Sequence, residues 1–149
     1  MSSYKQILYH SVLGTKNRNA TIPNTNWEEL YRYIGGIVKN KGCTLYQING
    51  IEDHIHILTD LHPTLSLSDF IKDIKVASSL WMKEQKSFPQ WNSWGKGYGA
   101  FTCSYREKER IISYIKRQKE YHKKESFLEE YKQLLVENGI EFDERYLFF

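Results

Sequence analysis

The sequence predicts an α+β fold in which a single four-stranded sheet is built from strands interleaved with helices. Three observations support this prediction. Four short runs are rich in β-forming residues, helical spacing of apolar residues recurs between them, and the segments follow the order β-α-β-β-α-β. That order is the split-βαβ or ferredoxin-like plan, an antiparallel four-stranded sheet with helices on one face, and here further C-terminal helices follow it.

The length and composition are those of one ordinary globular domain. We expect residues 1–149, at 17.8 kDa, to form a single domain that can bury a core. The sequence is 40% hydrophobic and 26% charged, as is usual for a soluble protein. No apolar run approaches the ~20 residues of a membrane span, and the N-terminus shows no apolar signal segment. We therefore expect a cytoplasmic protein with no membrane part.

A strand and a helix are expected to open the chain. β-forming residues are concentrated from Tyr4 to about Lys16, which predicts the first strand, and a polar loop follows from residue 14 to residue 24. Asn24 or Thr25 can cap a helix. The apolar residues at helical spacing in it are Trp27, Leu30, Tyr31, Ile34 and Val38. Lys41-Gly42 is expected to end this helix.

A hairpin and a long helix are expected next. Residues 43–48 predict the second strand, Asn49-Gly50 is a strong signal for a hairpin turn, and the third strand is expected from about His54 to Leu61. Ser66 or Ser68 can then cap a helix. Its expected core face consists of Phe70, Ile71, Ile74, Ala77, Leu80 and Trp81.

The last third of the chain is expected to hold one strand and two helices. An aromatic loop over residues 87–96 leads into a fourth strand over residues 97–104. A helix is expected from Arg106 to about Lys123, and another from about Ser126 to Asn138. No clear pattern marks the tail that follows.

Charge is distributed unevenly over these helices, although the net charge is only +3. Residues 106–124 hold eight Lys and Arg against three Glu, whereas residues 125–149 hold seven acids against two basic residues. A basic helix beside an acidic helix and tail from about residue 125 suits a polyanion-binding surface with a solvated, dimer-facing appendage. A charge run is also what an ordinary wet surface shows, so nucleic-acid binding is one of two interpretations.

Residues 53–58, Asp-His-Ile-His-Ile-Leu, are the most informative stretch. On a strand, His54 and His56 point to one face about 7 Å apart, where both can reach one divalent metal. A buried hydrogen-bonded pair would give the same pattern. A histidine-triad nucleotide hydrolase would need a third histidine where Leu58 stands, and a two-histidine phosphoesterase would need duplicate His-x-Thr motifs, so neither class fits. Asp53 alternates away from the pair and is expected at most to orient a ligand.

Tyr114 and Gln118 stand four residues apart on the predicted basic helix and therefore share a face. Gln118 could complete a three-ligand set with the two histidines. A tyrosine hydroxyl, with a pKa near 10, is a poor nucleophile unless nearby cations or a metal-polarised phosphate compensate. Any one of eleven tyrosines is more often a packing residue. A pair of metal-binding histidines on a strand and a tyrosine on a helix together suggest phosphoryl transfer to the tyrosine hydroxyl.

Taken together, these motifs resemble those of the single-tyrosine HUH transposases of the smallest bacterial insertion sequences (the TnpA type, REP-associated relatives included), where U is a bulky hydrophobic residue. The resemblance covers almost the whole chain. It rests on five stretches in order, namely residues 9–18, 49–56, 94–98, 114–118 and 121–124. Relatives often carry a second histidine at the position of Tyr121, a small departure.

The resemblance implies a mechanism and a ligand set. His54, His56 and Gln118 would be the metal ligands and Tyr114 the nucleophile, with Mg²⁺ or Mn²⁺ as the cofactor. Attack by Tyr114 on single-stranded DNA would give a 5′-phosphotyrosine intermediate and a free 3′-OH, and the reverse step would rejoin strands without ATP. The chain would thus be a metal-dependent DNA strand transferase that serves transposition.

The resemblance also implies partners. Family members act as homodimers on single-stranded DNA with subterminal hairpins, and the tyrosine helix of one subunit commonly completes the site of the other. Candidate DNA contacts are Lys16, Arg18, Arg110, Lys116, Arg117, Trp94 and Tyr98. For Trp94 a place in the core is an equally good interpretation. Two alternatives stay open: a domesticated relative that processes repetitive palindromes, and a catalytically inactive protein that binds hairpins or single strands.

Overall fold

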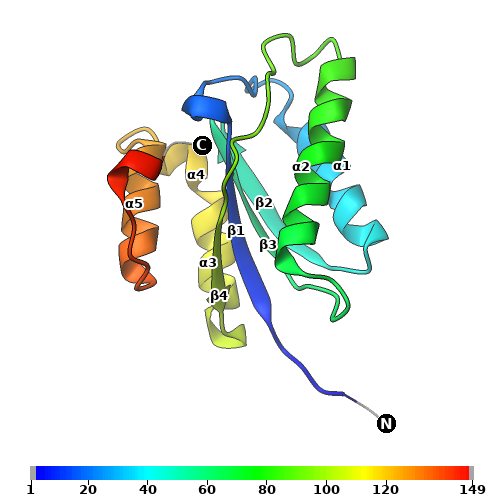
Figure 1. The fold of residues 1–149 in the computed structure, drawn as a ribbon, viewed down its shortest axis with the longest axis vertical. Coiled ribbons are helices and arrows are strands. Elements are labelled where there is room, and N and C mark those ends of the chain that lie inside the picture. The colour runs from blue at the N-terminus through cyan, green and yellow to red at the C-terminus, as the bar shows by residue number, and fades with distance from the viewer. Residues whose placement is uncertain (1–2, 148–149) are drawn as a thin grey trace.

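A computed structural model describes residues 3–147 and contains one four-stranded sheet (Figure 1). The strands are β1 (Leu8–Gly14), β2 (Leu45–Ile51), β3 (His54–Thr59) and β4 (Gly99–Cys103). They lie in the order β2-β3-β1-β4, and every neighbouring pair is antiparallel. The predicted ferredoxin-like plan is confirmed.

Helices cover both faces of this sheet. Helices α1 (Trp27–Asn40) and α2 (Leu67–Glu84) lie on one face, and α3 (Lys108–Lys116), α4 (Gln118–Tyr121) and α5 (Phe127–Glu137) lie on the other (Figure 1). Short 3₁₀ turns follow β1, precede α3 and lie near the C-terminus. Within residues 3–147, no helix is both long enough and apolar enough to pass through a lipid bilayer.

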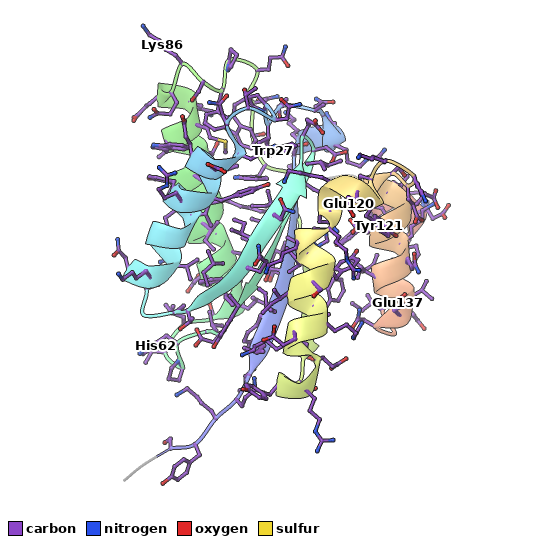
Figure 2. The ribbon with its side chains drawn as sticks, turned by 180° about the vertical axis from the view of Figure 1, so that it is seen from behind. Trp27, His62, Lys86, Glu120, Tyr121 and Glu137 are labelled. Atoms are coloured by element: carbon purple, nitrogen blue, oxygen red, sulfur yellow. The ribbon has the colours of Figure 1, made fainter. Side chains whose placement is uncertain are left out.

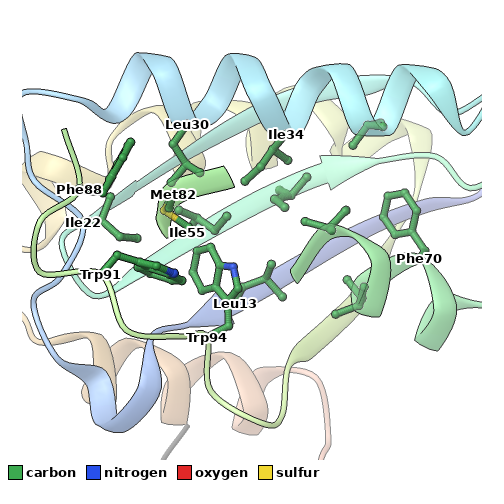
Figure 3. Packing of buried hydrophobic residues seen from close by; sticks show 14 of the residues in the cluster. Leu13, Ile22, Leu30, Ile34, Ile55, Phe70, Met82, Phe88, Trp91 and Trp94 are labelled. Atoms are coloured by element: carbon green, nitrogen blue, oxygen red, sulfur yellow. The ribbon is translucent and has the colours of Figure 1, made fainter. Parts of the chain in front are cut away.

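The larger core lies between the sheet and the α1–α2 layer. Because side chains alternate along a strand, Ile55 and Ile57 of β3 face this layer, together with Leu13 of β1. Trp91 and Trp94, from the loop before β4, close one end of it (Figure 3). The other face of β3 is left to His54, His56 and Leu58, under the C-terminal helices.

The core-facing row of α2 differs from the predicted one at Leu80, which is 59% exposed. Ser78 takes the buried place instead. Its hydroxyl donates to the Ile74 carbonyl oxygen at 2.6 Å and accepts from Trp94 Nε1 at 2.9 Å. A hydroxyl that bonds within its own helix can be buried at little cost. A prediction based on hydrophobicity alone therefore placed Leu80, and not Ser78, in the core.

The predicted hairpin turn at Asn49-Gly50 is also wrong. Both residues lie inside β2, and the turn falls at Glu52 and Asp53. Glycine is needed at position 50 for another reason, because a Cβ there would lie 2.0 Å from the His54 carbonyl oxygen. Gly50 therefore permits the close approach of β2 to the strand that carries the histidines.

We expect Gly50→Ala to destabilise the fold by at least about 1–3 kcal/mol, the usual cost of overpacking a rigid site. The clash falls on backbone atoms, which cannot rotate away. Urea unfolding measures the change. Gly36→Ala on α1 is the matched control, because a Cβ there meets nothing within 4 Å, and alanine favours a helix by up to about 1 kcal/mol. Equal stability of the two variants would contradict the explanation.

The C-terminal helices depart from prediction in two ways. The helix expected over residues 106–123 is interrupted at Arg117 (φ −94°, ψ 14°), where Asn49 Nδ2 donates to the carbonyl oxygens of Ile115 and Lys116 at 3.0 and 3.1 Å. Helix α5 is not the solvated appendage that its acidity suggested, because Phe127, Tyr131 and Leu135 pack against Val12 and Phe101 of the sheet. Apolar packing fixes α5 over the sheet.

Candidate active site

Strand β3 places His54 and His56 on the face under the C-terminal helices, as their alternation predicts. Both side chains are fully buried, with ring centroids 5.0 Å apart. His10 of β1 joins them on this face, and its Nε2 lies 2.8 Å from His56 Nδ1. Three histidines of two adjacent strands thus form the floor of the site.

Helices α3 and α4 bring Tyr114 and Gln118 over this floor. The Tyr114 ring centroid lies 5.7 Å from that of His56, and Gln118 Oε1 lies 2.9 Å from His54 Nε2. Figure 2 views the helices that carry them from behind, with Tyr121 labelled on α4. The four residues implied by the resemblance therefore meet within one chain.

Glu130 of α5 lies at the centre of the site, although the sequence analysis gave it no role. Its side chain is almost completely buried. Carboxylate oxygen Oε1 lies 3.1 Å from His56 Nε2, 3.3 Å from His54 Nε2 and 3.1 Å from His122 Nε2. One carboxylate oxygen therefore faces three imidazole nitrogens.

The other oxygen of Glu130 faces the predicted nucleophile. Oε2 accepts a hydrogen bond from the Tyr114 hydroxyl and another from Gln118 Nε2, the latter at 2.7 Å. The Phe127 ring at the start of α5 stacks on His54, with centroids 3.9 Å apart and planes 1° apart. The two hydrogen bonds orient the carboxylate, and the stacking holds the His54 ring against the start of α5.

Signals for these missed residues were present but weak. Glu130 lies three residues after Phe127 and next to Tyr131, so it falls on the apolar side of α5, where an unpaired carboxylate is unusual. His122 lies inside the motif of residues 121–124, and its spacing in the sequence does not by itself predict a role. Asp53 was expected to orient a ligand, and its Oδ1 lies 2.7 Å from His54 Nδ1.

Burial and mutual contact shift the pKa values of these groups. Burial disfavours the charged form of His54, yet hydrogen bonds to Asp53 and Glu130 raise its pKa to about 9. Burial and the neighbouring His56 lower the pKa of His10 to about 3. The surrounding histidines outweigh burial at Glu130 and hold the pKa of its carboxyl far below the usual value.

Tyr114 is shifted in the direction that opposes nucleophilic attack. Its burial, together with the charge and hydrogen bond of Glu130, raises the pKa of the phenol well above its ordinary value. A cation bound near Glu130 would offset that negative charge. The site thus keeps the hydroxyl protonated unless a positive charge is added.

The donor atoms of the site suit a divalent metal ion. His54, His122 and Glu130 offer ligand atoms that all lie within 4.8 Å of one another. Gln118 Oε1 adds a neutral oxygen 2.9 and 3.0 Å from the Nε2 atoms of His54 and His122. Adjacent ligands around an octahedral ion with bonds of about 2.1 Å lie about 3.0 Å apart. Imidazole and oxygen ligands together suit Mn²⁺ and related ions.

The predicted DNA contacts come from several elements of the fold. Lys116 and Arg117 are exposed where α3 meets α4, Lys16 is exposed after β1, and Arg18 is partly buried nearby. Arg110 is exposed and pairs with Glu107 at 2.8 Å.

The two aromatic candidates are less accessible. Trp94 is only 7% exposed and packs in the core, so it offers no free ring for stacking. Tyr98 is half-buried, and the Lys75 ammonium lies 5.9 Å from its ring centroid.

Two hollows flank the site. A pocket of about 200 Å³ between β4, α3 and α5 is lined by His10, Arg110 and Tyr114 among others. A groove of about 820 Å³ runs between the start of α1, β2 and the α3–α4 junction, with Lys116 and Lys119 on its wall. One hollow leads to the tyrosine, and the other carries the basic residues.

Comparisons with known proteins all identify transposases. Residues 3–118 match the family described as "Transposase IS200 like". The ISDra2 transposase TnpA of Deinococcus radiodurans is 28% identical over 76% of this chain and 84% of its own length. The transposase for insertion sequence element IS200 of Salmonella typhimurium is 31% identical over 77% of this chain and 78% of its own.

A solved structure shares the fold. It is that of a REP-associated tyrosine transposase bound to a REP hairpin, and it superposes with a TM-score of 0.61 at 16% identity, covering 82% of this chain and 74% of that one.

Proposed function

The chain belongs to the family of IS200-like transposases, and from this premise we propose that it is a metal-dependent single-stranded DNA transposase with Tyr114 as its nucleophile. The observation that carries the proposal is the position of the Tyr114 hydroxyl, which is hydrogen-bonded to Glu130 at the edge of a buried cluster of metal-binding side chains. Burying so many polar groups is costly, which favours a chemical role for them over simple binding.

In the proposed reaction, the Tyr114 oxygen forms a bond to phosphorus while the bond from phosphorus to the 3′ oxygen breaks. The Tyr114 hydroxyl gives up its proton and the leaving 3′ oxygen takes one up, so the products are a 5′-phosphotyrosine and a free 3′-OH. Attack by another 3′-OH on the phosphotyrosine reverses the step and rejoins two strands.

His54, His56 and Gln118 are the ligands that this proposal takes from the family. A bound Mg²⁺ or Mn²⁺ would polarise the scissile phosphate as a Lewis acid. Around it, His10 and Asp53 contact the outer nitrogens of the two histidines and fix their orientation. Glu130 holds the tyrosine hydroxyl beside the cluster.

The proposed substrate is single-stranded DNA that carries hairpins near the element ends. A hairpin is the ligand named for the structurally similar REP-associated transposase. In this chain the exposed Lys116 and Arg117 beside the long groove, with Lys16 and Arg18 as further candidates, are suited to contact phosphates. Because this substrate is chromosomal DNA, we propose that the protein acts at the nucleoid.

We expect Lys116→Ala to weaken hairpin binding most at low ionic strength and to flatten its salt dependence. Losing one phosphate contact reduces the slope of log K against log[salt] by about 0.7–0.9. Fluorescence anisotropy at several salt concentrations measures this slope. Lys83→Ala, an exposed lysine on α2 across the sheet, is the matched control. Identical slopes for the two variants would remove Lys116 from the proposed surface.

The homodimer implied by the resemblance remains part of the proposal. The contacts of Tyr114 form here within one chain, and exchange of the tyrosine helix between two chains would rebuild the same contacts in trans. Mass measurement by light scattering, with and without hairpin DNA, tests whether the chain dimerises.

A covalent-adduct experiment tests the function itself. The protein is incubated with labelled single-stranded DNA that carries a terminal hairpin and with Mn²⁺ or Mg²⁺. We expect a denaturant-resistant protein–DNA complex that a chelator prevents. Hairpin binding without any adduct would favour the inactive binding protein. A genomic gene copy without flanking terminal hairpins would favour the domesticated relative.

A further inference from the structure

We infer that His122 and Glu130 are direct ligands of the ion, together with His54. This inference rests on the proposed function and adds two ligands to it. Both residues lie beyond residues 3–118, the part that matches the family. The short helix α4 and helix α5 would therefore complete the metal centre.

The first argument is the convergence of donor atoms. The ligand atoms of His54, His122 and Glu130 lie within 4.8 Å of one another, and Glu130 Oε1 is 3.3 and 3.1 Å from the two Nε2 atoms. These separations match the edges of a coordination polyhedron around an ion with bonds of about 2.1–2.2 Å. All three side chains are at least nine-tenths buried. The group is therefore not one of the clusters of exposed acidic residues that are common without an ion.

The second argument is a count of ring protons. His54 has oxygen atoms on both sides. Its Nδ1 faces Asp53 Oδ1 at 2.7 Å, and its Nε2 faces Gln118 Oε1 at 2.9 Å and Glu130 Oε1 at 3.3 Å. His122 repeats this arrangement, with Nδ1 at 2.7 Å from the Glu125 carbonyl oxygen. A neutral imidazole carries only one N–H. If Nδ1 holds it in both rings, each Nε2 presents a lone pair to an oxygen.

A cation removes this conflict. Placed between the two Nε2 atoms and Glu130, it accepts both lone pairs and satisfies the oxygen. The Nδ1 protons then remain on the contacts to Asp53 and Glu125, which is the outer arrangement that metal-bound histidines usually show.

The third argument is that Glu130 is held in place for this role. Its Oε2 is occupied by the Tyr114 hydroxyl and by Gln118, which leaves Oε1 for the ion. The carboxylate would thus join the metal to the nucleophile. Two imidazoles and a carboxylate make a softer, more nitrogen-rich set than Mg²⁺ prefers, so we expect Mn²⁺ to bind more tightly than Mg²⁺.

Mn²⁺ binding to the full chain, without DNA, tests the inference. Isothermal titration and the electron paramagnetic resonance signal of free Mn²⁺ both report affinity independently of activity. We expect Glu130→Gln and His122→Asn each to weaken Mn²⁺ binding at least about tenfold, because even groups that only orient ligands contribute roughly 10–100-fold. The matched controls are Glu129→Gln, an exposed neighbour on the same helix, and His62→Asn, an exposed histidine after β3; we expect neither to change affinity.

The possible outcomes separate the two proposals. Wild-type affinity in folded Glu130→Gln and His122→Asn would overturn this inference and leave the ligand set of the proposed function in place. A wild-type protein that binds no Mn²⁺ and forms no DNA adduct would overturn both. Circular dichroism verifies folding, and if Glu130→Gln does not fold, His122→Asn alone decides, because it removes a ligand without touching the hydrogen bond of Tyr114.

Discussion

Tyr114→Phe is expected to abolish the covalent protein–DNA adduct while the protein still binds hairpin DNA. The substitution removes only the hydroxyl oxygen that would bond to phosphorus. We expect the rate of strand cleavage to fall more than about 10³-fold, equivalent to over about 4 kcal/mol in the activation barrier. Denaturing electrophoresis of labelled DNA measures the adduct, and anisotropy measures hairpin binding.

The structure indicates that this variant will fold. Glu130 Oε2 loses one donor but keeps Gln118 Nε2 at 2.7 Å, so the carboxylate is not left without a partner. Tyr121→Phe is the matched control, because its ring lies 6.0 Å from that of Tyr114 and its hydroxyl donates to Glu125 instead. An undiminished adduct in Tyr114→Phe, or equal losses in both variants, would refute Tyr114 as the nucleophile.

The sheet could be predicted from the sequence because its signals are local. Runs of β-forming residues mark the strands, and the two-residue period of a strand places His54 and His56 on one face. A four-residue interval places Tyr114 and Gln118 on one helical face, and these two residues still converge on Glu130 although Arg117 interrupts the helix. The regular geometry of strands and helices was therefore enough to predict that these four residues share the site.

The remaining features depend on contacts between distant segments. Asn49-Gly50 has the local preferences of a turn, but the approach of β2 to the His54 backbone and the bonds of Asn49 to α3 keep both residues in the strand. Glu130 lies 74 residues from His56. Its burial depends on how the apolar residues of α5 pack on the sheet, which charge counting along the chain does not reveal.

The second large effect concerns the metal, and His54 is the ligand that both the proposed function and the further inference share. We expect His54→Asn to lose metal-dependent cleavage by more than about 10²-fold, since Lewis-acid stabilisation is worth several kcal/mol. Asparagine is too short to reach the position of Nε2. Cleavage assays across a Mn²⁺ titration measure the effect, with the exposed His62→Asn as the control.

The loss should come with little change in hairpin affinity, because Lys116 and Arg117, which we propose contact phosphates, are exposed where α3 meets α4, whereas His54 is fully buried. Removing the His54 ring also removes its stacking on Phe127, so some loss of stability is expected and has to be measured by thermal unfolding of the same sample. A folded His54→Asn protein that cleaves at the wild-type rate, or wild-type cleavage that persists in excess chelator, would show that the reaction does not use this cluster as a metal centre. Tyr114 would then need another source of positive charge, because burial and the Glu130 carboxylate both hold its proton in place.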